Sequence, residues 1–285
     1  MPDFPIIDAH VHLLDTKRFG YAWAAGVPAL QRDFSPDDLM ACAAPAQIEA
    51  FVFAEVDVDD PQYMGEARWV DALARTEKRL KGAVAALPLE RGAAIEADMA
   101  ELAALPVARG VRRLIQNQPD PGFVLQPKFI EAVKLLPRHN LSFDVCIFHT
   151  QMTNTLAFMR LCPQVSFILD HIGKPGIKAG LLDPWRAQLR EMARLPNVVC
   201  KLSGVTTEAE HNSWTRDQLR PYIDHVIECF GFDRVMYGGD WPVSELAGNY
   251  GAWLAALDWA TQGCSEAEKR KLFRDTAIRA YRLEM

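Results

Sequence analysis

Two histidines one residue apart, His10 and His12, end an apolar run that begins at Ile6. The run has the length and composition of a buried β-strand, in which alternate side chains point to the same face, so both imidazoles are expected on one face. Two imidazoles placed in this way can bind a divalent metal ion or transfer protons. The pair gains a functional meaning only if later strands bring matching polar groups to the same end.

Strand-like apolar runs recur along the chain, and each is followed by a polar or amphipathic segment. Nearly continuous apolar strands that alternate with helical segments predict a parallel sheet buried on both faces. Eight such units are the number that closes a (β/α)8 TIM barrel. A nucleotide-binding doubly wound sheet would need a glycine-rich turn after the first strand, and His12-Leu13-Leu14 stands there instead. We therefore predict a single α/β domain, a TIM barrel spanning residues 1–285. The runs are residues 6–12, 50–56, 80–87, 110–116, 141–149, 165–171, 198–204 and 234–240.

The segments between these runs carry helix signals. Ser35 followed by Pro36 is typical of an N-cap with proline at the first helical position. Apolar residues at helical spacing over 129–136 and 219–230 predict two further helices, and a closing helix is expected from Ser265 to Tyr281.

Enzymes with this fold place catalytic groups at the C-terminal ends of the strands and in the loops that follow. Four of the seven histidines fall at such positions. This clustering indicates an active site at that end of the barrel. The polar residues that end the predicted strands are His10, His12, Glu55, Arg112, Gln116, His149, His171, Lys201, Ser203 and Asp240.

Three motifs lie at these strand ends: Asp8-Ala9-His10-Val11-His12, Leu169-Asp170-His171-Ile172-Gly173-Lys174-Pro175 and Tyr237-Gly238-Gly239-Asp240-Trp241-Pro242. Together they resemble the amidohydrolase superfamily, in its amidohydrolase-related (amidohydrolase 2) branch, over essentially the whole chain. Cys200-Lys201-Leu202-Ser203-Gly204, followed by Thr207-Glu208-Ala209, is most similar to the sugar lactonases of that branch, such as L-fuconolactonase and L-rhamnonolactonase. The resemblance implies a TIM barrel that hydrolyses a lactone ring, with Asp240 as the base.

Lactone hydrolysis needs a water made nucleophilic and a stabilised negative charge on the carbonyl oxygen. We expect Asp240 to accept the proton of the water. His10, His12 and His171 are expected to donate hydrogen bonds to the carbonyl, or to bind a divalent ion that polarises it. These four residues are the predicted catalytic set.

A metal is not strictly required in this prediction, because the resembling lactonases include members that act without one. A single divalent ion such as zinc is the alternative, held by His10, His12, His149 and Asp240. A binuclear site is not expected, since no lysine ends the fourth strand, where some relatives use a carboxylated lysine to bridge two metals. His149 is either a metal ligand, a residue that contacts substrate or a hydrogen-bonded residue of the pocket.

Substrate contacts are predicted for polar and aromatic residues around the barrel mouth. A guanidinium suits hydroxyl or carboxylate recognition, which favours Arg112. Trp23, with Phe19 and Tyr21 in the irregular stretch 13–35, either packs on a sugar ring or simply covers the barrel mouth. The predicted substrate-binding residues are Arg112, Gln116, His149, Lys174, Trp23 and Trp241.

Structural roles are the alternative for four further residues. Glu55 is expected to be only a polar residue at the rim of the barrel. Asp170 precedes His171 and is expected on the opposite face, where it supports a neighbouring group. Lys201 and Ser203 alternate on the seventh strand, and either can serve only to fill the barrel.

The composition excludes several classes of partner. The net charge of -6 argues against nucleic acid and anionic membranes, and no apolar run reaches the roughly 18–20 residues that span a bilayer. The first residues lack a signal peptide's basic and apolar regions, and the six cysteines form no C-x-x-C pair, so a cytoplasmic protein with reduced thiols is expected. The sequence leaves homo-oligomer formation open.

The predicted enzyme is a lactonase whose small-molecule substrate is a sugar aldonolactone of the L-fucono-, L-rhamnono- or galactonolactone type. Two alternatives come from the same superfamily branch: a lactonase for a carboxylated intermediate of the 2-pyrone-4,6-dicarboxylate type, and a zinc-dependent decarboxylase. A barrel that binds a ligand without turnover is a further alternative, and the full set of polar residues at the strand ends argues against it.

Overall fold

Eight parallel strands form one sheet, and each pairs with the next in the order β1 to β8. This is the order of a (β/α)8 TIM barrel, so the predicted fold is confirmed in the computed structural model, which describes residues 1–285. Beyond β8 the chain returns to β1 through two backbone hydrogen bonds, Asp240 N to His10 O at 2.9 Å and His12 N to Trp241 O at 2.7 Å. The strands are β1 (Ile6–Val11), β2 (Ile48–Ala54), β3 (Leu80–Ala86), β4 (Ala108–Arg112), β5 (Ser142–Val145), β6 (Phe167–Leu169), β7 (Val198–Leu202) and β8 (Val235–Tyr237).

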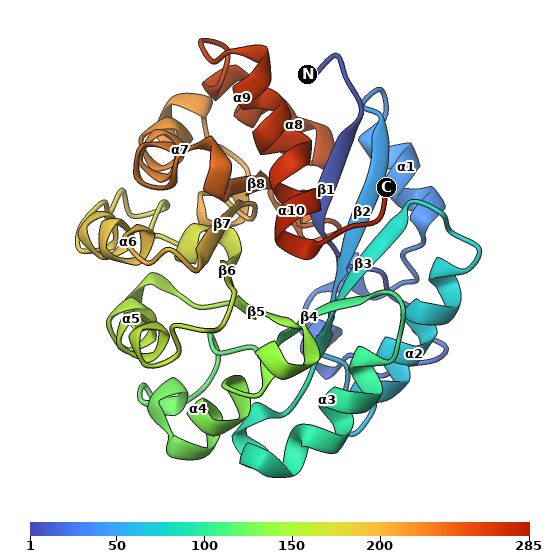
Figure 1. Cartoon of the computed structure of the whole chain (residues 1–285). Coiled ribbons are helices and arrows are strands. Elements are labelled where there is room, and N and C mark those ends of the chain that lie inside the picture. Colours follow the sequence, from blue (N-terminus) through green and yellow to red (C-terminus); the bar gives the residue numbers. More distant parts are fainter.

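Helices surround the ring of strands (Figure 1). Their apolar faces pack on the sheet, as in the helix that covers residues 219–230, where Leu219, Ile223, Val226 and Phe230 are buried. The helices are α1 (Pro36–Ala43), α2 (Tyr63–Ala74), α3 (Glu96–Ala103), α4 (Pro127–Val133), α5 (Met152–Leu161), α6 (Trp185–Ala193), α7 (Arg216–Phe230), α8 (Tyr250–Ala260), α9 (Glu266–Arg270) and α10 (Thr276–Tyr281).

The helix start predicted at Ser35 is confirmed. The Ser35 hydroxyl accepts the backbone N–H of Asp38, and the Asp38 carboxylate accepts the N–H of Ser35, with Pro36 at the first helical position. This reciprocal pair satisfies two backbone donors that the first turn of a helix leaves unpaired.

Two other helices differ from the prediction in detail. α4 ends at Val133, and a 3-10 turn at Leu136–His139 follows because Pro137 has no N–H to continue an α-helix. The expected single helix from Ser265 to Tyr281 consists of α9 and α10, joined by one π-helical turn at Lys271–Asp275.

Several strands are shorter than the apolar runs from which they were predicted. β5 ends at Val145, β6 at Leu169 and β8 at Tyr237, so His149, His171 and Asp240 lie beyond the strands and not on them. His171 and Asp240 adopt left-handed backbone conformations, with φ of 51° and 53°, which interrupt an extended strand. Strand alternation therefore does not apply to these side chains.

Two groups of buried apolar side chains form the core. The larger lies between the strands and the surrounding helices, and the smaller fills the barrel interior at the start of the strands. The smaller group joins Ile7, Val52 and Met236 of three strands to Tyr281 and Leu283 of the C-terminal segment. In Figure 1 this segment runs from α10 across the end of the barrel. The C-terminus thus closes the end of the barrel opposite to the predicted active site.

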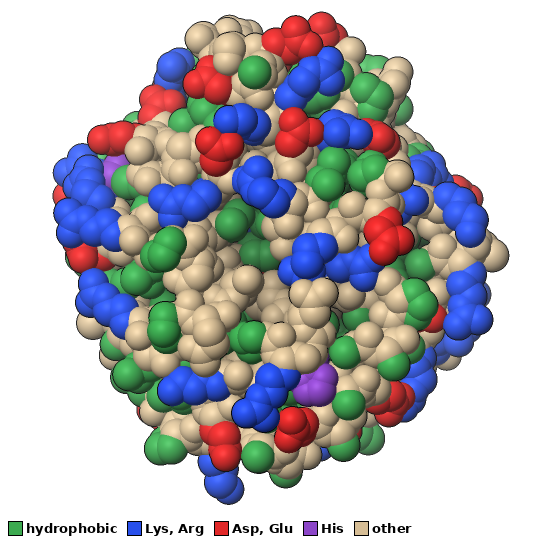
Figure 2. Space-filling model, viewed as in Figure 1, with side chains coloured by type: hydrophobic (Ala, Val, Ile, Leu, Met, Phe, Trp, Pro, Cys, Tyr) green, Lys and Arg blue, Asp and Glu red, His purple; other side chains and the backbone are tan.

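On the face shown in Figure 2, Lys and Arg side chains are interspersed with Asp and Glu. No helix combines the length with the apolar composition that crossing a membrane requires. All six cysteines are free thiols, and three of them, Cys146, Cys162 and Cys200, are buried.

Candidate active site

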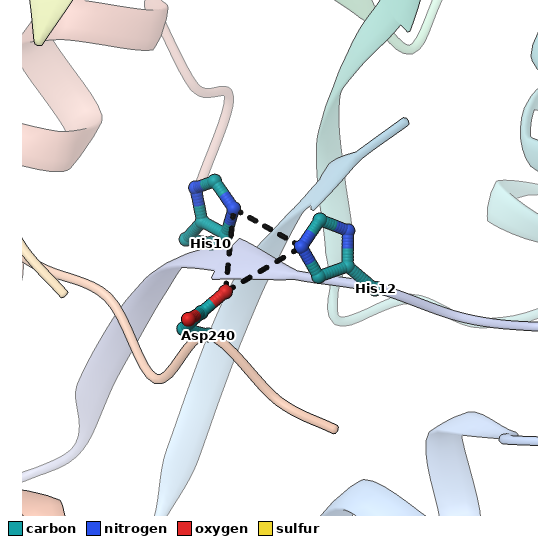
Figure 3. Close-up of side chains that lie close together, drawn as sticks. All are labelled: His10, His12 and Asp240. Carbon is teal, nitrogen blue, oxygen red and sulfur yellow. Dashed lines mark hydrogen bonds and ion pairs between the residues drawn. The ribbon is translucent and has the colours of Figure 1, made fainter. Parts of the chain in front are cut away.

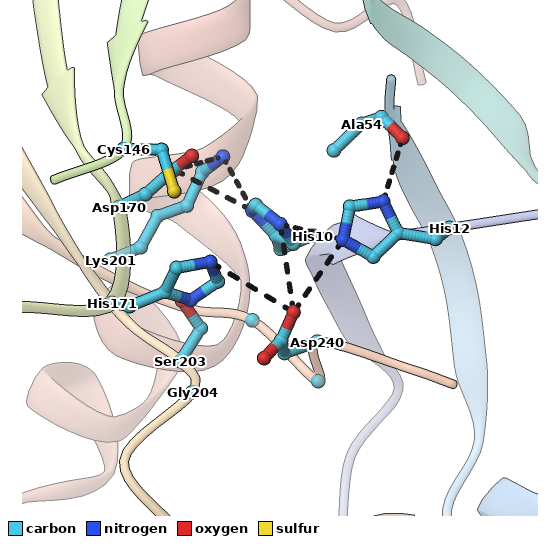
Figure 4. Close-up of polar contacts among 12 residues, drawn as sticks. His10, His12, Ala54, Cys146, Asp170, His171, Lys201, Ser203, Gly204 and Asp240 are labelled. Carbon is cyan, nitrogen blue, oxygen red and sulfur yellow. Dashed lines mark hydrogen bonds and ion pairs between the residues drawn. The ribbon is translucent and has the colours of Figure 1, made fainter. Parts of the chain in front are cut away.

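Three imidazoles and one carboxylate meet at the C-terminal end of the barrel. His10 and His12 come from the end of β1, His171 from the turn after β6, and Asp240 from the turn after β8. The Nε2 atoms of His10 and His12 are 3.2 Å apart, which confirms that the two rings lie together. Asp240 Oδ1 lies 3.5 Å from His12 Nε2 and 3.8 Å from His10 Nε2 (Figure 3). It lies 3.9 Å from His171 Nε2 (Figure 4). The predicted catalytic residues therefore form one cluster.

The left-handed conformations of His171 and Asp240 bring both side chains into this cluster. Non-glycine residues in this region cost roughly 1–3 kcal/mol each, and such residues gather at active sites. Gly204, which follows β7, leaves the space they need, because a Cβ there would lie 2.6 Å from His171 Nδ1 and 3.1 Å from Asp240 Oδ2. The φ of Gly204, +58°, also favours glycine.

Asp8 lies on the outer side of β1 and fixes the backbone of two site residues. Its Oδ1 accepts the N–H of His10 at 2.9 Å and the N–H of Gly239 at 2.8 Å, while Oδ2 accepts the hydroxyl of Tyr250 at 2.9 Å. Burial raises the pKa of Asp8 to about 7, against the opposing effect of these hydrogen bonds. One side chain thus connects β1 to the turn that carries Asp240.

A buried charged network lies beside His10 (Figure 4). Lys201 Nζ donates to Asp144 Oδ2 at 2.6 Å and lies 2.9 Å from Asp170 Oδ1 and 3.1 Å from His10 Nδ1. The Tyr281 hydroxyl donates to Asp144 as well, and the side chains of Lys201, Asp144 and Asp170 are fully buried. Asp170, expected opposite His171, therefore lies in the barrel interior with it, because the chain leaves the extended conformation at His171.

The protonation of the network follows from its geometry. Burial alone would lower the pKa of Lys201, but Asp144 and Asp170 outweigh it and raise that pKa above its ordinary value. Burial raises the pKa of Asp144 to about 6, whereas Lys201 and His10 overcome burial at Asp170 and hold its pKa well below the usual range. Lys201 is therefore an ammonium group beneath the site.

The catalytic cluster itself holds an ionised carboxylate beside the neutral imidazoles of His10 and His171. Burial lowers the pKa of His171 to about 4, despite the nearby Asp240, and burial together with Lys201 lowers that of His10 well below its ordinary value. Burial opposes ionisation of Asp240, but His171, His12 and His10 outweigh it and lower the pKa of that carboxyl. At neutral pH, Asp240 can accept a proton.

Arg112, predicted to contact substrate, is buried and already paired. Its Nε donates to Glu55 Oε1 at 2.6 Å, its Nη2 to the Glu55 carbonyl at 2.5 Å, and its Nη1 lies 3.4 Å from Asp170 Oδ2. Glu55, considered as a rim residue, is 1% exposed. In this structure the Arg112–Glu55 pair belongs to the barrel interior, beside the cluster.

His149 lies outside the cluster. Its Nδ1 is 2.9 Å from the Lys174 carbonyl, and it lines a cavity of about 740 Å³ that is also bordered by the loop after β7. The predicted four-ligand metal set that includes His149 is therefore not assembled, because β5 ends at Val145 and His149 follows four residues later. Lys174 Nζ lies 3.8 Å from Glu208 Oε1, and Glu208 borders the same cavity.

The remaining predicted contacts differ in exposure. Trp23 is 37% exposed, donates its indole N–H to the Val56 carbonyl at 2.7 Å, and lines a separate cavity of about 280 Å³. Gln116 is half-buried, and its Oε1 lies 3.4 Å from Cys146 Sγ. Trp241 is fully buried and packs edge-on against Phe34, so its ring supports the turn after Asp240 and is not exposed in the cavity wall.

A protein-family model described as Amidohydrolase matches residues 7–283. The chain belongs to the amidohydrolase family. The chain is 33% identical over 286 residues to a Burkholderia ambifaria protein named L-fucono-1,5-lactonase, with 98% of this chain and 96% of the relative covered. It is 25% identical over 204 residues to an L-rhamnono-gamma-lactonase of Scheffersomyces stipitis, with 62% and 60% covered.

A solved structure extends the comparison. The crystal structure of a Burkholderia multivorans amidohydrolase with bound zinc has a TM-score of 0.89 to this chain at 30% identity, with 99% of this chain and 100% of that chain covered. The family resemblance that the three motifs predicted is thereby confirmed.

The donor atoms of this amidohydrolase fit a single divalent ion. One atom each from His10, His12 and Asp240 lies within 4.8 Å of the others, and three such ligands with an open position are typical of catalytic zinc. His12 Nδ1 faces the Ala54 carbonyl at 2.9 Å, the orientation that frees Nε2 as a ligand. A second group, His10, Asp170 and His171, shares His10 with the first, so the two groups compete for one imidazole.

Sequence reasoning assigned no role in the site to three residues of this amidohydrolase that shape it. Asp8 was within a quoted motif, Asp144 is a lone charge inside an apolar run, and Gly204 follows the seventh strand. An ionised side chain inside an apolar strand was the one available signal, since such a charge must find a partner in the barrel.

Proposed function

We propose that this amidohydrolase opens the lactone ring of a neutral sugar aldonolactone, of the L-fucono-, L-rhamnono- or galactonolactone type. The observation that carries the proposal is the ionised Asp240 carboxylate beside three imidazoles at the C-terminal end of the barrel. The identity of 33% to a relative named L-fucono-1,5-lactonase supports a lactone as the substrate class.

Asp240 is the general base in this proposal. It takes one proton from a water, the water oxygen bonds to the lactone carbonyl carbon, and the carbonyl oxygen gains the negative charge. When the tetrahedral intermediate collapses, the bond from carbon to the ring oxygen breaks and Asp240 returns the proton to the leaving oxygen. The product is the open-chain hydroxy acid. His12, whose Nε2 lies 3.5 Å from Asp240 Oδ1, borders the position of this water.

His171 supplies a hydrogen bond that stabilises the oxyanion. Nε2 of His171 faces the Asp240 carboxylate at 3.9 Å, and a carboxylate favours a protonated nitrogen opposite it, so we assign the ring proton to Nε2. Ser203 Oγ, 2.9 Å from Nδ1, holds the ring in this orientation. A preorganised donor of this kind contributes roughly 3–4 kcal/mol to the transition state.

When a divalent ion occupies His10, His12 and Asp240, it supplies Lewis-acid polarisation of the carbonyl. The proposal routes no step through it, since Asp240 and the imidazoles provide the base and the hydrogen-bond donors.

An uncharged substrate is supported by the state of the nearby arginines. Arg112 is paired with Glu55, and Arg113 donates to Glu90 at 2.8 and 3.0 Å, so neither guanidinium is free to bind a substrate carboxylate. The cavity beside His149 offers Thr207, Glu208 and Asn212, which suit hydroxyl groups. This pattern favours a polyol over a dicarboxylate.

The test is hydrolysis of a panel of aldono-1,4- and 1,5-lactones, followed with a pH indicator, with and without a chelator. The panel includes 2-pyrone-4,6-dicarboxylate, and a dihydroxybenzoate is assayed separately for loss of carbon dioxide. Sugar lactones are expected to be hydrolysed, and Asp240→Asn is expected to lower kcat by about 10²- to 10⁴-fold. Asp37→Asn, at a carboxylate that is 98% exposed, is the matched control and should retain activity.

Hydrolysis of the dicarboxylate alone, or decarboxylation alone, would replace the proposal with the corresponding alternative. Asp240→Asn acting as fast as the unaltered protein would remove Asp240 as the base.

A further inference from the structure

Lys201 is a buried lysine whose ammonium group has three polar neighbours. Its side chain is fully buried on β7, and its Nζ lies 2.6 Å from Asp144 Oδ2, 2.9 Å from Asp170 Oδ1 and 3.1 Å from His10 Nδ1. Asp144 accepts one hydrogen, and Asp170 Oδ1 forms an ion pair with the ammonium group. A second hydrogen points at the imidazole of His10, a candidate catalytic residue.

An ammonium group is only a donor, so this contact decides which nitrogen of His10 carries the proton. His10 Nδ1 must accept from Lys201 and therefore has no hydrogen. In a neutral imidazole the hydrogen is then on Nε2, the nitrogen that faces His12 at 3.2 Å.

The environment of His12 leads to the same assignment independently. His12 Nδ1 lies 2.9 Å from the Ala54 carbonyl, which can only accept, so Nδ1 carries the hydrogen. His12 Nε2 is then an acceptor, and His10 Nε2–H is the donor opposite it. Hydrogen bonds thus run in one direction, from Lys201 through His10 and His12 to Ala54.

The opposite tautomer of His10 has longer contacts. It would place the hydrogen on Nδ1 facing Asp170 Oδ1 at 3.5 Å and leave Nε2 to accept from Arg112 Nη1 at 3.4 Å. Both distances exceed the 3.1 and 3.2 Å of the first arrangement. This tautomer is nevertheless the one that a metal requires, because only it frees the lone pair of Nε2.

We propose that Lys201 is a positioning residue that holds His10 in the tautomer with hydrogen on Nε2, and so opposes metal binding at the His10, His12 and Asp240 site. Asp240 Oδ1 presents a lone pair to that site, whereas the lone pair of His12 Nε2 accepts the His10 hydrogen. His10 carries that hydrogen on the nitrogen that would bind the metal, and Lys201 is the reason. The inference concerns the site of the proposed function, but its test does not need turnover of any substrate.

The direct test is the ¹⁵N NMR spectrum of the histidine rings in chelator-treated protein, with His10→Gln and His12→Gln used for assignment. The expected result is a hydrogen on Nε2 and an unprotonated Nδ1 in His10, with the reverse in His12. A hydrogen on Nδ1 of His10, or on both of its nitrogens, overturns the proposal.

The second test is zinc affinity, measured by competition with a chromophoric chelator. Lys201→Met is expected to bind zinc about 10-fold more tightly, in line with the effect of groups that contact metal ligands, and to move the His10 hydrogen to Nδ1. Lys174→Met removes a positive charge at the barrel mouth without contact to His10, and serves as the control for charge alone. A folded Lys201→Met with the zinc affinity of the control or weaker overturns the proposal.

Lys201→Met leaves two buried carboxylates without their cation, so folding is checked by circular dichroism. Where the single variant does not fold, Lys201→Met combined with Asp144→Asn removes one charge of each sign and is expected to give the same tighter binding. The NMR test of the unaltered protein stands in either case.

Discussion

Asp8 Oδ1, on β1, accepts the backbone N–H of Gly239, which precedes Asp240, at 2.8 Å. The same oxygen accepts the N–H of His10 at 2.9 Å. Strand β8 is only three residues long, and β1 and β8 are not paired as a regular ladder, so this carboxylate joins the first and last strands of the barrel at the site. The base and one of its imidazoles are positioned by a residue that touches neither side chain.

Replacing Asp8 is expected to affect both stability and catalysis. Asp8→Ala leaves two buried backbone N–H groups without an acceptor, at about 1–3 kcal/mol each, so we expect a loss of roughly 2–4 kcal/mol in the free energy of unfolding. Asp8→Asn keeps one oxygen in place and should lose less. Urea denaturation and kcat of both variants check this, and equal stability of the alanine and asparagine variants would contradict it.

Replacing Gly204 by alanine adds a methyl group that both contacts the site and strains the backbone, and a control variant separates these two effects. Gly204→Ala brings a Cβ to 2.6 Å from His171 Nδ1 and should lower kcat by more than about 10-fold, since displacing a catalytic group by 1 Å can cost about 10²-fold. Gly231→Ala is the matched control: its φ is +64°, yet nothing lies within 4 Å of the new Cβ. Both variants should lose stability, about 1–3 kcal/mol each, because φ is positive at both positions, and the ψ of 166° at Gly231 lies in a region essentially restricted to glycine. Loss of activity in both, or in neither, would contradict the prediction.

Acid should destabilise the protein partly through His171. Its folded pKa, about 4, lies below the ordinary value of 6.5, so between these pH values the unfolded chain binds more protons than the folded one. Stability is then full above about pH 6.5 and falls as the pH drops toward 4, by up to about 1.4 kcal/mol per pH unit. Chelator-treated His171→Asn lacks this contribution. Its free energy of unfolding, measured by urea denaturation, should fall less steeply between pH 6.5 and 4. Identical slopes would contradict it.

Replacing Arg112 tests whether this residue has a structural role or the predicted contact with substrate. Arg112→Met leaves Glu55 buried without its partner, and such changes cost about 3–5 kcal/mol. The neighbouring pair of Arg113 and Glu90 is partly exposed, so Arg113→Met should cost about 1 kcal/mol or less. Thermal and urea denaturation measure both. An Arg112 variant that keeps its stability but raises KM would instead support the substrate contact predicted from sequence.

The sequence was sufficient for the fold and for the identity of the central residues. The apolar runs alternate with helical segments eight times, and burial on both faces leaves a parallel barrel as the arrangement that satisfies them. His10, His12, His171 and Asp240 were predicted because polar groups that end buried strands meet at one end of such a barrel. The family motifs made the same prediction from local patterns.

Alternation along a strand could not place residues beyond the strand. His171 and Asp240 turn into the site through left-handed backbone conformations, and His149 lies four residues past β5, outside the cluster. The solvent exposure of these side chains could not be predicted from the sequence either. Trp241 and Arg112, an aromatic and a charged residue near the mouth, become buried only when neighbouring turns pack on them.

The sequence by itself therefore determined which chemical groups the barrel brings together, because strand periodicity and strand ends are local properties of the chain. Only the tertiary structure decided what each group can do. Lys201 meets His10 across 191 residues, and Asp8 meets Gly239 across 231. Hydrogen bonds between such distant residues fix tautomers, charges and ring orientations, and no local pattern records them.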